Sequence, residues 1–459
     1  MKIMNPVNGF VRLETGEHVI LCDAWLTDGI FDGSWSLYPP LRDTEGHLKG
    51  VTHCFISHIH EDHFDDATLG RMDRNVIMVI PDVYPNHIMA TRLKGMGFGD
   101  VRMLKPERRA EISNGLTMEV VPRMNAYGQE LEQYNRRDLE SLVIDTGVII
   151  TAAGIKIVLL ADNVPYRPED AGSSVEHMKY CDLLGFSFNG AASDYPLCYE
   201  SLTADEKRAI ANEREDKREA VNRAFIDLIR PKALMPYSSE FALRGPMARR
   251  FAEWCGDAWW ADKGKVVERY IANTALPTFA LYEGDELRVA RDEGYQLVKR
   301  TTQIPKLSDV AEKLYSPVPN TRDRYPAVDD LEEIDTLVDR ASSHMFEKMT
   351  QYRVESDWVL ELALEDSGWQ PLYVDLHERH STRQRPEKRP TLSCICEANY
   401  LAGLLRGECH WNNAMISFNL RWKRVPNEFD RPLFDALNYF HVPRAAGAAS
   451  QPVQKAQAR

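Results

Sequence analysis

One short stretch constrains the fold of this chain more than any other. Residues 51–56 are apolar and β-branched or aromatic at most positions, which is typical of a short buried strand. They lead directly into Ser-His-Ile-His-Glu-Asp-His-Phe at residues 57–64, where three histidines and two carboxylates fall within six positions. Asp65 and Asp66 follow, and acidic residues favour the first turn of a helix. The pattern predicts a strand that ends in a ligand-rich loop before a helix.

The spacing of this loop suits two neighbouring metal ions. His58 and His60 are two positions apart and can converge only if the chain is not helical there. Asp62 and His63 are adjacent and therefore point in different directions. We expect one ion to take His58 and His60 and the other to take Asp62 and His63. Imidazoles beside a carboxylate favour zinc or non-haem iron. The alternative interpretation is a solvated polar loop without metal.

Composition excludes several classes of function. The chain carries 56 lysines and arginines against 69 aspartates and glutamates, a net charge of −13, which argues against nucleic acid or an anionic membrane as the main partner. No apolar run is long and uncharged enough to span a bilayer. The N-terminus lacks the apolar core of a signal peptide. The eight cysteines are scattered, so we expect reduced thiols in a cytoplasmic protein.

The loop at residues 57–64 resembles the metal-binding motif of the metallo-β-lactamase fold superfamily. This resemblance implies an α/β fold, a four-layer αββα sandwich with a dinuclear site at the sheet edge. Within the superfamily, several segments are similar to CMP-N-acetylneuraminate hydroxylases and their bacterial relatives. These segments are Asp-Ala-Trp-Leu-Thr at 23–27, Gly-Ser-Trp-x-Leu-x-Pro-Pro at 33–40, Cys-His-Trp-Asn-Asn-Ala at 409–414 and Phe-Asp-Arg at 429–431. Fold similarity does not identify a substrate.

The resemblance also indicates a fifth ligand. Residues 142–145 and 155–163 read as a hairpin, and Asp162 ends its second, apolar strand as the superfamily's bridging aspartate does. A carboxylate between two cations lowers their mutual repulsion, whereas an unpaired one at a buried strand end is costly. Asp23 ends an earlier strand, and we expect it to brace the loop by backbone hydrogen bonds rather than to bind metal.

Two ligand histidines of the superfamily are missing. After the strand at residues 116–122 the chain offers Asn125, and after the strand at 231–236 it offers Ser238, Ser239 and Glu240. We therefore predict the metal ligands His58, His60, Asp62, His63 and Asp162. The candidate catalytic residues are Asp62, Asn125 and Glu240. This ligand set leaves coordination positions open, as catalysis requires.

The first functional hypothesis is oxidative. Few imidazoles and many oxygen ligands favour iron, and the resemblance to the hydroxylases implies oxidation of a small polar molecule. Those hydroxylases also carry a Rieske segment with Cys-x-His and Cys-x-x-His pairs, which this chain lacks. Electrons would then come from an electron-donor protein or from the substrate.

The second hypothesis is a zinc- or manganese-dependent hydrolase, because most members of the superfamily hydrolyse their substrates and such ions activate water. The two missing histidines argue against it. A third interpretation, a binding protein with a degenerate site, fits poorly with five intact ligands.

The chain divides into two units. Residues 1–300 form the expected metal-binding domain, and residues 301–328, rich in proline and charge, the expected linker. Residues 329–443 read as an α+β domain with a helix from 328 to about 351 and strands at 372–376, 391–396 and 414–422. Residues 444–459 read as a disordered tail.

Overall fold

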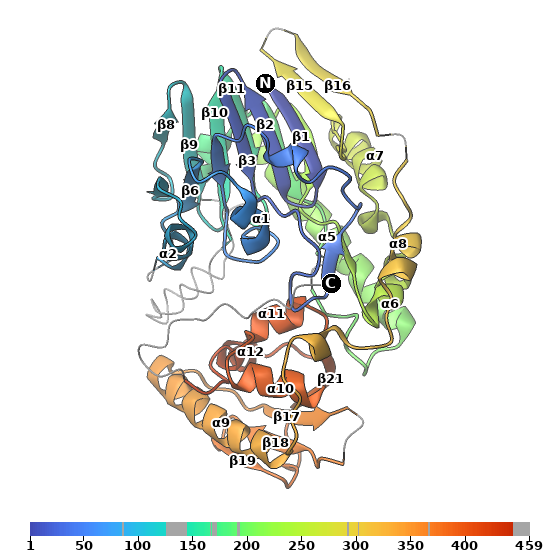
Figure 1. Ribbon diagram of the computed structural model, residues 1–459. Coiled ribbons are helices and arrows are strands. Elements are labelled where there is room, and N and C mark those ends of the chain that lie inside the picture. Colours follow the sequence, from blue (N-terminus) through green and yellow to red (C-terminus); the bar gives the residue numbers. More distant parts are fainter. Residues whose placement is uncertain are drawn as a thin grey trace.

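The computed structural model describes residues 1–459 apart from 85–86, 125–144, 166, 168–171, 191–192, 292, 302, 366–367 and 444–459. The predicted tail lies entirely outside the described residues. The described part of the chain has a mixed α/β fold, as predicted, with sheets of eight, six, five and two strands (Figure 1).

The first sheet carries the histidine loop. Its strands β3, β5, β6 and β7 are parallel, so their carboxyl ends meet at one edge. In spatial order the strands are β16 (Gly294–Val298), β15 (Glu286–Ala290), β1 (Lys2–Val7), β2 (Phe10–Thr15), β3 (His18–Cys22), β5 (His53–Phe55), β6 (Ile77–Pro81) and β7 (Val101–Leu104). The strand predicted at residues 51–56 is thus confirmed as β5.

The second sheet contributes the aspartate that follows β11. Strands β11, β12 and β13 are parallel, and β8 to β11 are antiparallel neighbours. In spatial order the strands are β13 (Leu234–Tyr237), β12 (Leu183–Ser187), β11 (Ile155–Leu159), β10 (Gly147–Ala152), β9 (Leu116–Val121) and β8 (Ala110–Ser113). An antiparallel hairpin forms between β10 and β11, but β10 begins after Asp145; residues 142–144 of the strand predicted there lie outside the described residues.

A buried apolar cluster joins the two sheets. It includes Ile20 and Val79 of the first sheet and Val120, Ile157 and Met235 of the second. Burial of this much apolar surface holds the sheets face to face and brings the ends of β5 and β11 to one place.

Helices cover the outer faces of both sheets. On the first sheet, Leu69 of α1 (Asp66–Arg71) and Leu93 of α2 (Ile88–Gly95) share a core with residues of β5 and β6. On the second, Phe225 of α5 (Ala204–Ile229) and Tyr270 of α7 (Lys263–Thr274) pack on β11 and β12. A capping box formed by Thr203 and Glu206 begins α5.

The C-terminal unit contains a five-stranded sheet and several helices. In spatial order its strands are β19 (His380–Thr382), β18 (Leu372–Asp375), β17 (Val359–Leu364), β20 (Thr391–Cys396) and β21 (Arg421–Val425). Its helices are α9 (Glu332–Tyr352), α10 (Ala398–Leu405), α11 (Trp411–Ile416) and α12 (Arg431–Leu437). The strand predicted at 414–422 is wrong over most of its length: residues 414–416 belong to α11, which His410 caps, and only Arg421 and Trp422 lie in a strand, β21. Trp411 of α11 donates to the Phe440 carbonyl at 2.8 Å.

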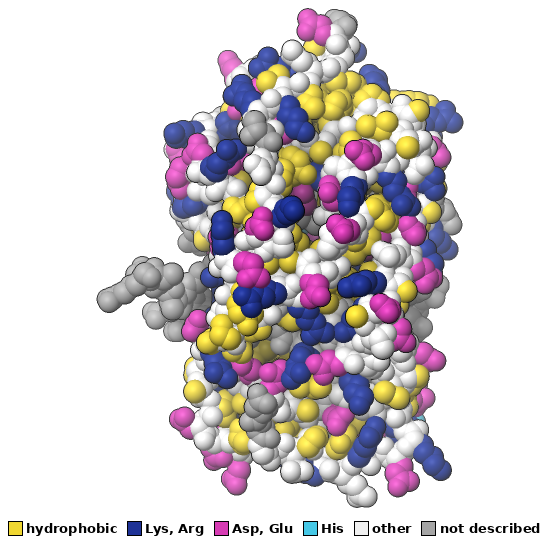
Figure 2. All heavy atoms as spheres, turned by 90° about the vertical axis from the view of Figure 1, so that its right-hand side faces the viewer, with side chains coloured by type: hydrophobic (Ala, Val, Ile, Leu, Met, Phe, Trp, Pro, Cys, Tyr) yellow, Lys and Arg dark blue, Asp and Glu magenta, His cyan; other side chains and the backbone are white. Residues whose placement is uncertain are grey.

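The described residues also contain several shorter elements. They are α4 (Ser174–Met178), α6 (Met247–Cys255), α8 (Leu307–Leu314), the short sheet of β4 (Trp35–Leu37) and β14 (Phe241–Leu243), and the 3-10 turns at Gly46–Leu48, Trp259–Ala261 and Asn320–Asp323. None of the helices in the described residues has the length and hydrophobicity that crossing a membrane requires. On the face shown in Figure 2, basic and acidic side chains are intermixed.

Buried polar contacts join the C-terminal unit to the chain around β4. Asp32 accepts hydrogen bonds from Tyr325 at 2.6 Å, from Tyr400 at 2.9 Å and from the Cys409 thiol at 2.9 Å. Trp35 donates to the Ile416 carbonyl at 2.9 Å. These contacts hold α11 beside the histidine loop, where Asn412 lies 3.0 Å from His60.

Candidate metal centre

The histidine loop is held by its own backbone and by Asp23. Asp23 accepts a hydrogen bond from the Ser57 amide at 2.7 Å, which is the bracing role predicted for it. Beyond Ser57 the chain turns, because the amides of His63 and Phe64 donate to the His60 carbonyl at 3.0 and 2.7 Å. The extended half of the loop presents His58 and His60 together, and the turn brings His63 back beside them.

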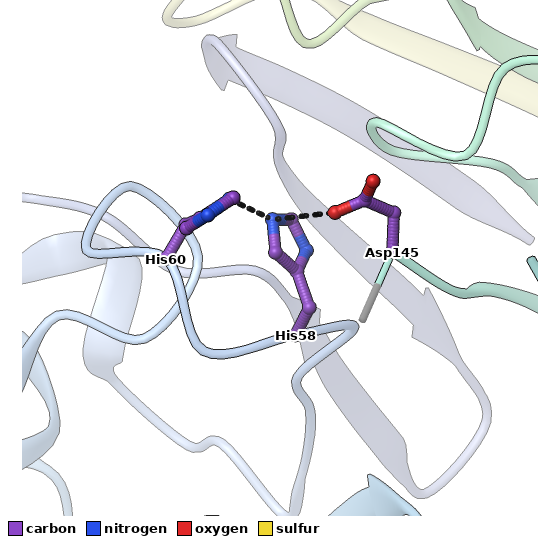
Figure 3. A group of neighbouring side chains, drawn as sticks. All are labelled: His58, His60 and Asp145. Atoms are coloured by element: carbon purple, nitrogen blue, oxygen red, sulfur yellow. Dashed lines mark hydrogen bonds and ion pairs between the residues drawn. The ribbon is translucent and has the colours of Figure 1, made fainter. Parts of the chain in front are cut away.

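His58 is the centre of the arrangement. It is fully buried, and its Nε2 lies 2.9 Å from His60 Nδ1 and 3.7 Å from Asp145 Oδ1 (Figure 3). The same Nε2 lies 3.8 Å from Asp162 Oδ2. Its Nδ1 lies 2.9 Å from the Ser57 hydroxyl. A partner on Nδ1 fixes the ring and directs Nε2 toward the carboxylates.

His63 forms the second half of the site. Its Nε2 is buried, lies 3.3 Å from Asp62 Oδ2 and 3.4 Å from Asp162 Oδ2, and has no hydrogen-bond partner among the described residues. Its Nδ1 lies 3.1 Å from Asp23. A buried imidazole nitrogen aimed at two carboxylates without a hydrogen bond fits a cation bound between them.

Two groups of side chains have the donors and the proximity that one ion requires. His58, His60 and Asp145 form one group, and His58, His63 and Asp162 form the other; within each, the ligand atoms lie within 4.8 Å of one another. Each group has two imidazoles and one carboxylate, the donor set of non-haem iron sites and of many catalytic zinc sites. Because one imidazole nitrogen binds one ion, His58 serves only one group at a time.

Charge and burial perturb these groups strongly. Burial, together with the neighbouring His63 and His60, lowers the pKa of His58 well below its ordinary value, which keeps its ring neutral and able to bind a cation. Burial also lowers the pKa of His63, but Asp62, Asp162 and Asp23 together raise it well above the ordinary value. Burial raises the pKa of Asp162, yet His63 and His58 outweigh it and hold that pKa low.

Polar side chains from other elements orient the carboxylates. Ser238, after β13, donates to Asp162 Oδ1 at 2.8 Å, and Asn8, between β1 and β2, donates to Asp62 at 3.4 Å. Ser238 was predicted as a substitute for a missing histidine, and the structure places its hydroxyl on a carboxylate that faces both His58 and His63.

The C-terminal unit also reaches the site. The Asn412 amide nitrogen, on α11, lies 3.0 Å from His60 Nε2. An amide can present either its nitrogen or its oxygen to a ring nitrogen. With Nε2 engaged by Asn412, Nδ1 is the His60 nitrogen that faces His58. Asn412 is therefore a positioning residue for His60.

Replacing Asn412 by alanine should weaken metal binding by about 10- to 100-fold, because ring orientation and tautomer are no longer fixed. The measurement is competition with a metallochromic chelator. Asn413→Ala, one position along the same helix, is the control and should bind metal as the wild type does. Equal affinities of the two variants would show that Asn412 does not position His60.

The two candidate ligand groups open onto a cavity of about 690 Å³. His60, Asp62, Asp145 and Asp162 form one part of its wall, whereas His58 and His63 lie behind them. Trp35 and Phe241, stacked at 3.6 Å, add an apolar wall. The C-terminal unit closes the cavity with residues of α11, β21 and α12 and of the chain between β21 and α12. The volume is within the range of small-molecule sites.

A buried acid, Asp194, also lines this cavity. Its carboxylate accepts a hydrogen bond from Trp422 Nε1 at 2.6 Å. Burial raises the pKa of Asp194 to about 7, although Trp422, the Tyr195 amide, Arg214 and Arg424 act in the opposite direction. The folded protein therefore prefers the neutral acid below neutral pH.

This shift predicts a pH dependence of stability. The raised pKa favours folding at acid pH, and this contribution is lost as pH rises from the unfolded-state pKa through about 7. Asp194→Asn stays neutral, so its stability relative to the wild type should increase by about 2 kcal/mol between about pH 5 and 8. Denaturant unfolding at both pH values measures this, with the exposed Asp357→Asn as control. Parallel pH profiles for Asp194→Asn and the wild type would contradict the assignment.

The predicted site residues are distributed as follows. The structure brings His58, His60, His63 and Asp162 together and sets Asp62 beside His63; their binding of metal stays a prediction. Asn125 lies outside the described residues. Glu240 is buried, and its carboxylate pairs with the ammonium of Lys263 rather than joining either metal-binding group.

Sequence reasoning missed Asp145 and Asn412. Asp145 had a signal, a carboxylate ending an apolar run, which is the same signal that identified Asp162. Asn412 had none, because its contact with His60 spans 352 residues of sequence.

Comparisons with known proteins give short or distant similarities. No family model matches the chain. A stretch of 92 residues is 33% identical to a putative Rieske 2Fe-2S iron-sulfur protein of Mycolicibacterium smegmatis, and 30% identical to one of Mycobacterium tuberculosis. Each match covers 20% of this chain and only 17% of the relative.

Similar solved structures include both hydrolases and a hydroxylase. A possible metal-dependent hydrolase from Veillonella parvula is 17% identical, covering 62% of this chain and 98% of its own, with a TM-score of 0.43. An isothiocyanate hydrolase from Delia radicum gut bacteria is 15% identical, and the match covers 63% of this chain and 99% of the hydrolase, also with a TM-score of 0.43. CmlA, a diiron β-hydroxylase from Streptomyces venezuelae, is 15% identical, and the match covers 65% of this chain and 54% of CmlA, with a TM-score of 0.41.

Proposed function

We propose that this protein is a metal-dependent enzyme that holds two divalent cations and oxidises a small polar metabolite. The observation that carries the proposal is the position of Asp162: one of its oxygens lies 3.8 Å from His58 Nε2 and 3.4 Å from His63 Nε2. A carboxylate between two imidazoles of different orientation is placed to bridge two ions. His58, His60 and Asp145 would hold one ion, and His63, Asp62 and Asp162 the other.

The fold belongs to the same proposal. Two sheets sharing one core, with helices on both outer faces, support a four-layer αββα sandwich of the metallo-β-lactamase type over residues 1–300. Residues 329–443 would be the α+β domain that closes the cavity, with 301–328 connecting the two. All eight cysteines are free, which is typical of a reducing compartment and favours the cytoplasm.

Iron is the favoured metal because the first ion would have two imidazoles and one carboxylate, and the second one imidazole and two carboxylates, and such mixed nitrogen and oxygen donors suit non-haem iron. Bound iron would supply oxygen activation and electron transfer at the cavity wall. The chain itself would keep His58 neutral, orient His60 through Asn412, fix Asp162 through Ser238 and exclude water with the Trp35 and Phe241 wall.

The reaction needs electrons from outside this chain. Inserting one atom of O₂ into a C–H bond consumes two electrons and two protons and releases water. The sequence has no cysteine–histidine pairs for a Rieske cluster, so an electron-donor protein is part of the proposal unless the substrate itself is oxidised by a further two electrons.

A zinc- or manganese-dependent hydrolase is the second candidate. The observation that favours it is the same donor set, because two histidines and one carboxylate also hold catalytic zinc. In that case Asp145 or Asp62 at the cavity wall would hold the proton of an attacking water.

Metal analysis of untagged protein separates the candidates. Growth in medium with iron, zinc and manganese, followed by elemental analysis, should give about two equivalents of iron. A visible band that changes on exposure to oxygen supports oxidation. Zinc, together with esterase or phosphodiesterase turnover, supports hydrolysis. Protein that binds none of these metals would contradict both.

A further inference from the structure

A buried arginine lines the cavity away from the metal ligands. Arg424, on β21, is only 5% exposed. Its guanidinium lies over the rings of Tyr195 and Tyr199, 4.9 and 5.0 Å from their centroids. Two of its nitrogens donate to Asn427 Oδ1 at 3.3 and 2.8 Å. The stacking and these bonds fix the plane of the guanidinium.

The charge of Arg424 has no ionic partner in the described part of the chain. A guanidinium has five N–H donors, and Asn427 supplies a single neutral acceptor atom for them. Asp194 lines the same cavity, but its carboxylate accepts from Trp422, and burial favours its neutral form. A buried cation without a paired anion is costly, and an anionic ligand would offset that cost.

The surroundings of Arg424 are basic and aromatic. Arg214 and Arg218 line the same cavity, and Arg218 pairs with Glu215 at 3.4 Å. Phe429 and Phe434 also line it and stack on each other at 5.1 Å with an angle of 22° between their planes. Phe429 is 66% exposed, which is unusual for a large aromatic side chain. This combination fits a ligand with a negative group and a flat apolar body.

We propose that Arg424 is the anion-binding residue of this cavity and that its ligand is an organic anion, a carboxylate or phosphate carried on an aromatic or similarly flat body. The proposal rests on the proposed function, since it names the substrate class of that site. Bidentate pairing with Arg424 would anchor one end of the molecule, Phe429 would cover its apolar part, and the other end would face Asp145 and Asp162.

Calorimetric titration of metal-free protein tests this without involving the metal. The probes are benzoate and phenyl phosphate, with benzyl alcohol as their neutral counterpart. Wild-type protein should bind at least one anion at least tenfold more tightly than benzyl alcohol, and the preferred anion distinguishes carboxylate from phosphate. In Arg424→Gln this anion should bind at least tenfold more weakly, with benzyl alcohol unchanged.

Two variants control the experiment. Lys423→Gln removes the same charge from the exposed neighbouring position on β21 and should leave binding unchanged. Phe429→Ala changes an exposed side chain, so it keeps the proposal testable if Arg424→Gln does not fold. It should weaken both aromatic anions several-fold and leave inorganic phosphate unaffected.

Anions that bind no more tightly than benzyl alcohol would overturn the proposal, as would unchanged binding in Arg424→Gln. Because no metal is present, either result leaves the metal content of the wild type as a separate measurement. A protein that binds the anions but never binds metal would retain the anion subsite and refute the proposed function.

Discussion

Alanine at position 162 will reduce the bound metal from about two equivalents to one or fewer, and activity will be lost with it. Asp162 Oδ2 is the carboxylate atom that lies near both His58 Nε2 and His63 Nε2. Without it, His63 and Asp62 retain too few donors for a second ion, and the charge repulsion between two cations is no longer screened.

Elemental analysis and a melting curve with and without added iron measure this result. Wild-type protein should melt at a higher temperature with metal, because the ions bind only the folded state. Asp162→Ala should lose most of that shift, and Asp162→Asn, which keeps the shape and one oxygen, should be intermediate. The exposed Asp73→Ala is the control. Two equivalents retained in Asp162→Ala would exclude a bridging role.

Replacing Lys263 by methionine will destabilise the protein by about 3–5 kcal/mol. The Lys263 ammonium is buried, pairs with Glu240, and donates to Asn5 Oδ1 at 3.2 Å and to the Leu281 carbonyl at 3.1 Å. Burial raises the pKa of Glu240, although Lys263 acts in the opposite direction. Removing the lysine leaves a buried carboxylate without a counter-charge.

A double-mutant cycle shows whether Glu240 acts in catalysis or in folding. If the pair is structural, Lys263→Met with Glu240→Gln should recover much of the lost stability, because the uncompensated charge is gone. If Glu240 is catalytic, Glu240→Gln should lose turnover while its unfolding midpoint stays near that of the wild type. If the free energy of unfolding of Lys263→Met fell by less than about 1 kcal/mol relative to the wild type, the structural interpretation would be contradicted.

The part of the site that could be predicted is the part encoded locally. His58, His60 and His63 lie on one loop after a recognisable strand, β5, and Asp162 follows a second strand, β11. Because both strands end at the same edge of the paired sheets, their position after the strand ends brings these residues close together. Asp145 carried the same signal, but residues 142–145 were interpreted as a strand, whereas β10 begins at Gly147 and Asp145 lies just before it.

The rest depends on tertiary contacts that no local pattern encodes. Glu240 lies in the loop where the sequence predicted a substitute for a metal ligand, but its carboxylate forms an ion pair with the buried ammonium of Lys263 on α7. The strand predicted at 414–422 fails because packing of Trp411 against the Phe440 backbone favours a helix there. That helix carries Asn412 to His60, so the error in secondary structure also concealed a residue of the site.

Anomalous X-ray diffraction from crystals of the metal-loaded protein tests the central claim most directly. Data at the iron and zinc absorption edges should show two peaks beside His58 and His63, with Asp162 between them and Asp145 on the His60 side. Absence of any peak at these residues in protein that carries metal, or a single ion bound elsewhere in the chain, would contradict the dinuclear site and the function proposed from it.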